Sequence, residues 1–122
     1  MKLTLTLTLI TASLLAVLVL IPANAASTVT RIKGEVGPGF TIEVEKAGKD
    51  VKTLKAGKYA IKVEDKATTH NFHLIGPGLN KKTGVPFKGE TTWMITLKPG
   101  RYTYQCDPHA ASGMKGSFRV TR

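Results

Sequence analysis

Cysteine is the most informative shortage in this 122-residue chain, because it occurs once, at position 106. A single cysteine excludes an intramolecular disulfide, so the fold cannot depend on a disulfide framework. A leftover cysteine in an exported protein indicates an intermolecular bridge or a specialised thiol. Because an exposed free thiol is oxidised outside the cytoplasm, we expect Cys106 to be deeply buried or bound to another group.

Acidic and aromatic residues are also few. The chain has 8 Asp and Glu residues against 18 Lys and Arg residues, and aromatic side chains make up 7% of it. The net charge of +10 favours an acidic partner or an anionic surface. Aromatic side chains are not interleaved with the lysines as they are in nucleic-acid-binding surfaces, so a nucleic-acid binder is disfavoured.

Long apolar runs are confined to the N-terminus, which has the order of a secretory signal peptide. Lys2 gives a short basic start, the following apolar stretch is densest over residues 12–21, and Ala-Asn-Ala at 23–25 is a small-x-small cleavage site. We therefore predict a signal peptide over residues 1–25 and export to the periplasm or the extracellular space. The alternative is a retained membrane anchor, because residues 3–21 are nearly long enough to span a bilayer.

The mature chain, residues 26–122, is predicted to be one domain of the all-β class. Short segments alternate apolar and polar side chains, as in "FTIEVEK" and "KYAIKVED", and Gly, Pro, Asn and Asp separate them. These segments cover residues 40–46, 51–55, 58–65, 70–76, 91–97, 101–106 and 117–121. About seven or eight short strands without a convincing helix predict a β-sandwich or barrel.

Two further expectations concern the surface and the interior. Residues 76–89 contain so much Gly and Pro that we expect a long surface loop rather than a regular element. Six aromatic residues are expected to pack in the core and at the edges of the sandwich: Phe40, Phe72, Trp93, Tyr102, Tyr104 and Phe118.

Three potential metal ligands stand together in "YQCDPHAASGM", residues 104–114. Cys106 ends a predicted strand, Pro108 turns the chain so that His109 can face the same point, and small residues then let the chain curve to present Met114. A thiolate, an imidazole and a thioether form a soft to borderline ligand set, which favours copper. Asp107 is interpreted as a turn residue.

A blue-copper site needs a second histidine from another part of the fold, in addition to one cysteine and a weak axial methionine. The only other histidines are His70 and His73, in "THNFHL". Their positions differ by an odd number, so in a regular strand they face opposite sides and only one of them reaches the metal.

The segments "THNFHL" and "YTYQCDPHAASGM" together resemble the cupredoxins, the small blue copper proteins of the plastocyanin type. In that family an early His-Asn pair supplies one ligand, and a late Cys-x-x-His-x-x-x-x-Met loop supplies three. The resemblance implies a Greek-key β-sandwich that binds one type 1 copper ion. It assigns the ligands as His70, Cys106, His109 and Met114, and it implies that Asn71 ties the two ligand-bearing segments together.

The second histidine of the early segment, His73, departs from the family pattern. We take His70 as the ligand because Asn71 follows it, and we expect His73 to face solvent or to contact a loop. A strand bulge would reverse this choice.

The resemblance implies single-electron transfer between redox partners, so we expect a monomeric electron carrier and not an enzyme. Storage, delivery or sensing of copper by the same residues is the alternative function. The acidic docking patches of the plant members are absent, so we expect the lysines to steer a partner with an acidic surface. Docking is expected on an apolar surface around His109, extended by Gly76, Pro77 and the turn at 37–39.

An enzyme is disfavoured on the residues themselves. A Cys-His pair only three residues apart in a tight loop is poor geometry for a thiol hydrolase. One cysteine and three histidines are also too few for a two-copper centre or a second histidine-based metal cluster.

Overall fold

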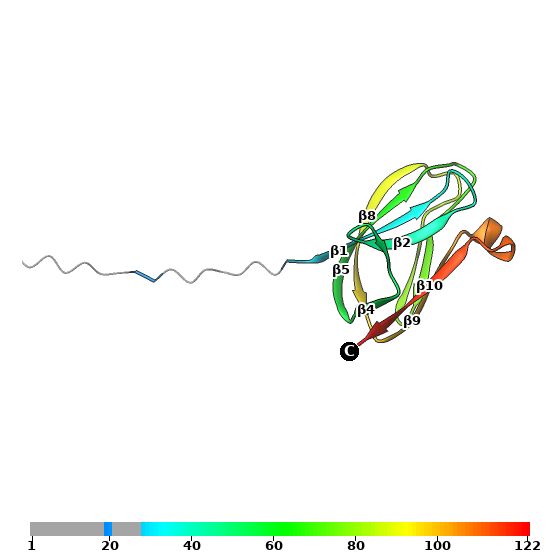
Figure 1. Cartoon of the computed structure of the whole chain (residues 1–122). Coiled ribbons are helices and arrows are strands. Elements are labelled where there is room, and N and C mark those ends of the chain that lie inside the picture. The colour runs from blue at the N-terminus through cyan, green and yellow to red at the C-terminus, as the bar shows by residue number, and fades with distance from the viewer. Residues whose placement is uncertain (1–18, 21–27) are drawn as a thin grey trace, which may run out of the picture.

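The computed structural model of the chain describes residues 19–20 and 28–122. Within them, ten strands form two sheets that pack face to face (Figure 1). The predicted signal peptide lies almost wholly outside the described residues, so its presence and cleavage stay predictions. No helix in the described part of the chain is long and apolar enough to cross a bilayer.

Each sheet has five strands, and in both of them strands from distant parts of the chain are neighbours. The first sheet has the order β3-β2-β1-β5-β8, with bounds Lys49–Asp50, Ile42–Lys46, Thr30–Val36, Gly57–Asp65 and Gly89–Leu97. The second has the order β4-β10-β9-β6-β7, with bounds Thr53–Lys55, Lys115–Thr121, Gly100–Gln105, His73–Gly76 and Leu79–Lys82. The pairs β1–β5 and β4–β10 are parallel, and the others are antiparallel. The predicted all-β sandwich is therefore confirmed, with slightly more strands than expected.

Three of the strands that the structure describes were not predicted: β1, β3 and β7. The strands β3 and β7 are short and mostly exposed. The missed β1 is longer and buries Ile32 and Val36, but Gly34, which packs against Phe72, stands where an apolar side chain would continue the alternation. The expected loop over residues 76–89 is wrong in its first part, because β6 and β7 form a hairpin there. Three of the four residues of β7 are exposed, so apolar and polar side chains do not alternate along this edge strand. The one short helix among the described elements is a 3₁₀-helix, η1, at Asp107–Ser112.

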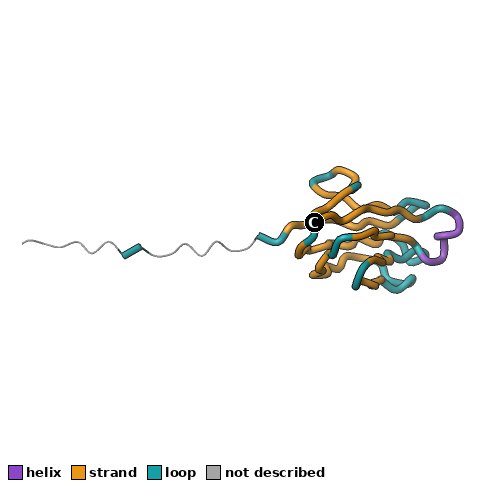
Figure 2. Tube along the Cα trace, turned by 90° about the horizontal axis from the view of Figure 1, so that it is seen from below, coloured by secondary structure: helices purple, strands orange, loops and turns teal. Residues whose placement is uncertain are grey.

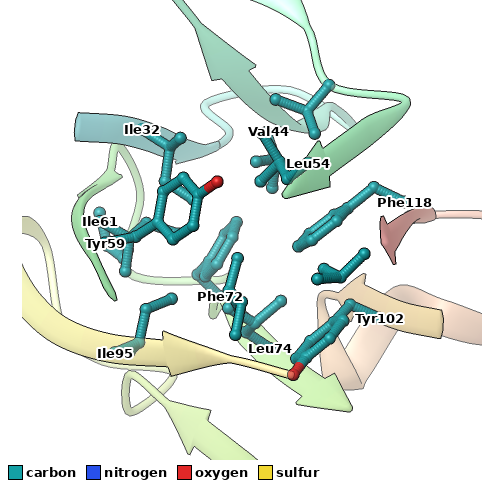
Figure 3. Packing of buried hydrophobic residues seen from close by; sticks show 14 of the residues in the cluster. Ile32, Val44, Leu54, Tyr59, Ile61, Phe72, Leu74, Ile95, Tyr102 and Phe118 are labelled. Atoms are coloured by element: carbon teal, nitrogen blue, oxygen red, sulfur yellow. The ribbon is translucent and has the colours of Figure 1, made fainter. Parts of the chain in front are cut away.

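Alternating side chains from the two sheets meet in one core (Figure 3). In β5, Tyr59, Ile61 and Val63 are buried while Lys58 and Lys62 are exposed, as the period of two requires. The labelled core side chains are Ile32, Val44, Leu54, Tyr59, Ile61, Phe72, Leu74, Ile95, Tyr102 and Phe118.

Five of the six expected core or edge aromatics lie in or against this core, and the sixth does not. Phe72, Tyr102 and Phe118 are buried, and Trp93 and Tyr104 pack against the core while partly exposed. The prediction for Phe40 is wrong, since 65% of this residue is exposed. Phe40 belongs to the turn before β2 and not to the strand, so the alternation of the strand does not direct it inward.

The fold places the predicted ligand segments at one end of the sandwich. Figure 2 shows η1 at this end and the C-terminus at the other. Because His73 of β6 pairs with Gln105 of β9, residues 70–72 and Cys106 leave paired strands side by side. Pro77, in contrast, accepts a hydrogen bond from the hydroxyl of Tyr102 and lies against Gly100, where β9 begins. The expectation that residues 76–77 extend the surface around His109 is therefore wrong.

Replacing Gly34 by Ala is expected to destabilise the sandwich. A Cβ at this position of β1 would lie 2.5 Å from Cζ of Phe72, whose side chain is fully buried and has no room to retreat. Overpacking of this kind lowers the free energy of unfolding by about 1–3 kcal/mol, measurable by urea denaturation. At the control position Gly84, the nearest atom lies 3.7 Å from an added Cβ, so Gly84→Ala should change stability by less than about 1 kcal/mol. Equal stability of the two variants would contradict the packing argument.

Candidate metal centre

Three of the predicted ligands converge at the η1 end of the sandwich. The Sγ atom of Cys106 lies 3.4 Å from Nδ1 of His109 and 3.7 Å from Nδ1 of His70. The two Nδ1 atoms are 3.1 Å apart. All three donor atoms thus lie within 4.8 Å of one another, although His70 and Cys106 are 36 residues apart in the sequence.

His70 lies in the irregular segment between β5 and β6, not in a regular strand. Its Nε2 is 3.2 Å from the carbonyl oxygen of Pro38. A carbonyl only accepts, so Nε2 carries the hydrogen of the neutral ring, and Nδ1 turns its lone pair toward Cys106 and His109. The turn can approach this closely because residue 37 is glycine: its φ is +72°, and a Cβ there would lie 2.9 Å from Cδ2 of His70.

The loop from Cys106 to Met114 is closed by its own backbone hydrogen bonds. The N–H of Cys106 donates to the carbonyl of Met114 over 3.0 Å, and the N–H of Met114 donates to the carbonyl of His109 over 3.2 Å. Pro108 stands in the first turn of η1, where its missing N–H costs no helical hydrogen bond. The short helix therefore folds His109 back toward Cys106, as the sequence predicted.

Met114 closes the base of this loop and is buried. Its backbone lies beside that of Cys106, so the residue is in the place where a fourth ligand would come from. Ligation by the thioether sulfur stays a prediction.

Asn71 ties the two ligand-bearing segments together, as expected. Its Oδ1 accepts a hydrogen bond of 2.7 Å from the N–H of Asp107, and its Nδ2 donates to Oδ2 of Asp107 over 2.9 Å. Nδ2 also donates to the carbonyl of Thr83 at 3.3 Å. Asn71 is buried, and burying its amide without hydrogen-bond partners would cost free energy. These bonds offset that cost.

Asp107 is more than the turn residue that the sequence suggested. Its Oδ1 accepts hydrogen bonds from Nε2 of Gln105 at 2.9 Å and from Nδ1 of His73 at 2.7 Å. Burial alone raises the pKa of the Asp107 carboxyl, but hydrogen bonds from Gln105, His73 and Asn71 outweigh it and hold that pKa at about 2. The sequence held no local signal for this role, since all but the Gln105 bond come from a segment more than 30 residues away.

His73 lies outside the donor cluster. Its ring contacts Asp107 of the ligand loop and Asn80 of β7, which agrees with the expectation of a loop-contacting imidazole. Of the two early histidines, the structure brings His70 and not His73 to Cys106 and His109.

Phe40 is a residue of this site that sequence reasoning missed. Its ring centroid lies 4.6 Å from that of His109 and 5.8 Å from that of His70. The ring is largely exposed and His109 is half-buried, so the two together form the solvent side of the cluster. The turn at 37–39 contacts His70 of the cluster, and its part in a docking surface around His109 stays a prediction.

The donor set fits copper. Two imidazole nitrogens and a thiol sulfur are the protein ligands that copper takes in electron-transfer sites. Cys106 is fully buried and His70 nearly so, which keeps water from the thiol and the first imidazole. The hydrogen bond from His70 to Pro38 orients its ring from outside the donor set, as in other sites where a histidine binds a metal.

Comparison with known proteins also indicates copper binding. A family model described as copper binding proteins, plastocyanin/azurin family, matches residues 23–121. A structure of reduced rusticyanin is similar at 24% sequence identity and a TM-score of 0.57, covering 75% of this chain and 78% of that one. Another structure, named as the copper protein rusticyanin, has 23% identity and a TM-score of 0.57, covering 75% and 76%. Dithionite-reduced auracyanin from the photosynthetic bacterium Roseiflexus castenholzii has 21% identity and a TM-score of 0.56, covering 76% and 98%. These structural likenesses show the fold.

Replacing Asn71 by Ala is expected to weaken the connection between the two ligand segments. The variant leaves the N–H of Asp107 and the carbonyl of Thr83 without the bonds that Asn71 makes to them. The free energy of unfolding of the copper-free protein should fall by about 1–3 kcal/mol in urea denaturation. Lys88→Ala, at an exposed loop position before β8, is the control and should cost less than about 0.5 kcal/mol. Similar losses in both variants would argue against the special role of Asn71.

Proposed function

The chain belongs to the plastocyanin/azurin family of copper binding proteins, and we propose that it is an exported blue copper protein that carries single electrons between redox partners. The observation that carries the proposal is the convergence of two imidazole nitrogens and one thiol sulfur at one end of the sandwich. His70, Cys106 and His109 would hold the ion, with Met114 as a fourth, weaker ligand. Bound copper supplies a one-electron couple between Cu(I) and Cu(II).

The protein's contribution is to keep the donor atoms in one arrangement while the charge at the site changes. His70 and Cys106 leave strands that are hydrogen-bonded to each other, and Asn71 links the segments again through Asp107. The backbone bonds between Cys106 and Met114 close the loop that carries the other donors. A scaffold restrained in this way rearranges little when an electron enters or leaves, which favours fast transfer.

Partners would reach the site through His109. Cys106 and His70 are buried, whereas His109 is half-buried and has Phe40 beside it. Pro108 and Ala111 are exposed in the same loop and add apolar surface. We expect transient docking on this face, because a small apolar contact lets the partner leave after transfer.

Charge is expected to guide that encounter. Glu35, Glu64 and Glu90 pair with lysines on the outer face of the first sheet, so a large share of the few carboxylates is already neutralised. The remaining excess of lysine and arginine favours a partner with an acidic surface. Export follows from the predicted signal peptide at residues 1–25, and we propose a periplasmic or extracellular location for the mature chain.

The site itself is tested by adding one equivalent of Cu(II) to the copper-free protein. We expect an intense visible thiolate-to-copper band that ascorbate bleaches and an oxidant restores. Cys106→Ser should abolish the band, whereas Ser112→Ala, an exposed position in the same loop, should retain it. A colourless wild-type protein, or a weak band that survives Cys106→Ser, would reject the blue copper site. Slow electron exchange with ready release of Cu(I) would favour copper storage or delivery instead.

Electrostatic steering is tested with small one-electron reagents of opposite charge. The oxidation rate of the reduced copper protein by anionic hexacyanoferrate should fall by roughly tenfold as ionic strength rises from about 0.01 M to about 1 M. The rate with a cationic phenanthroline–cobalt reagent should rise over the same range, because screening removes a repulsion. Two rates with the same salt dependence would show that the net charge of +10 does not act at the site of transfer.

A further inference from the structure

His73 makes two short side-chain contacts, and the proposed function gives it no role. Its Nδ1 lies 2.7 Å from Oδ1 of Asp107, and its Nε2 lies 2.6 Å from Oδ1 of Asn80. Only 13% of the side chain is exposed. A carboxylate accepts and does not donate, so Nδ1 carries a hydrogen and the imidazole donates to Asp107.

Three side chains donate to the Asp107 carboxylate, but they are not equivalent. Gln105 is two residues from Asp107, so its bond is local to the segment that carries both. Asn71 and His73 belong to the early ligand segment, 36 and 34 residues away. These two are the side chains that anchor Asp107 to another part of the fold, Asn71 from the buried side and His73 from nearer the surface.

His73 is itself held in place. Its backbone pairs with Gln105 of β9 on one side and with Lys82 of β7 on the other. Its second ring nitrogen contacts Asn80, also on β7. The imidazole therefore bridges the β6–β7 hairpin and the loop that begins at Cys106, with a fixed partner at each end.

We propose that His73 is a positioning residue, which holds Asp107 and through it keeps the Cys106–Met114 loop closed over the donor cluster. The consequence for a bound metal rests on the proposed function. Donation from His73 offsets the negative charge of a carboxylate that is one residue from Cys106. Without that donor the charge stabilises Cu(II) more than Cu(I), since Cu(II) is the more positive ion, and the reduction potential falls.

The first test uses the copper-free protein and measures how fast Cys106 reacts with 5,5′-dithiobis(2-nitrobenzoate). The thiol is fully buried, so the reaction reports opening of the loop. His73→Leu should accelerate it by at least about tenfold, because a hydrogen bond to a charged group is lost. His73→Gln keeps an amide donor and should react within about threefold of wild type. Lys82→Leu places the same side chain on the neighbouring strand, without a bond to Asp107, and should also react at the wild-type rate.

Low concentrations of urea separate local opening from general destabilisation. If His73 holds only the loop, the reaction of His73→Leu should depend on urea much less steeply than global unfolding does. A wild-type rate in His73→Leu overturns the proposal. So does an accelerated rate that carries the full urea dependence of unfolding, because His73 would then be an ordinary stabilising residue.

The second test measures the reduction potential of the copper-loaded variants. The potential should be lower in His73→Leu than in wild type and restored toward wild type in His73→Gln. An unchanged potential would overturn the effect of His73 on the metal, whatever the thiol reactivity. If wild type binds no copper, the proposed function fails, while the thiol measurements still decide whether His73 positions the loop.

Discussion

The pairing of β6 with β9 is the constraint on which the site depends. It sets His73 opposite Gln105, so that the residues just before one strand and just after the other emerge together at one end of the sandwich. Asn71 and Asp107 then join the two emerging segments by side-chain hydrogen bonds at the point where the ladder ends. The donor atoms of His70 and Cys106 meet because backbone pairing has already brought their segments into contact.

Much of the fold follows from periodicity, and most of the exceptions share a physical cause. In strands such as β5, buried apolar side chains alternate with lysines that stay exposed, so the pattern can be recognised in the sequence. The edge strand β7 exposes most of its side chains and has no such alternation. The 3₁₀-helix has only six residues and none of them is buried, so it lacks a periodic apolar face as well. Elements that bury few side chains therefore show little periodicity in the sequence. The missed strand β1 has another cause, because Gly34 interrupts the apolar alternation between Ile32 and Val36.

The candidate metal centre likewise has one part that the sequence predicts and one part that it does not. Cys106, His109 and Met114 are close in the sequence, so their residue types and spacing alone indicate a metal-binding loop. The choice of His70 came from the resemblance through Asn71, and the parity argument does not apply to the irregular segment in which His70 lies. The contacts of Asp107 with Asn71 and His73, and of Phe40 with the two imidazoles, join residues that are 30 or more positions apart. Such contacts depend on register and turn geometry, which composition and spacing do not report.

The direction of β1 and β10, the first and last strands, has a practical consequence. β1 begins and β10 ends at the end of the sandwich opposite η1, because Val36 leads into the turn beside His70 and Lys115 pairs with Gln105 next to the ligand loop (Figure 2). A linker, fusion partner or electrode attachment joined at either of these strand ends leaves His109 and Phe40 facing outward. The molecule can thus be tethered from its far end and oriented on a surface while the end that carries the donor cluster stays open to solution.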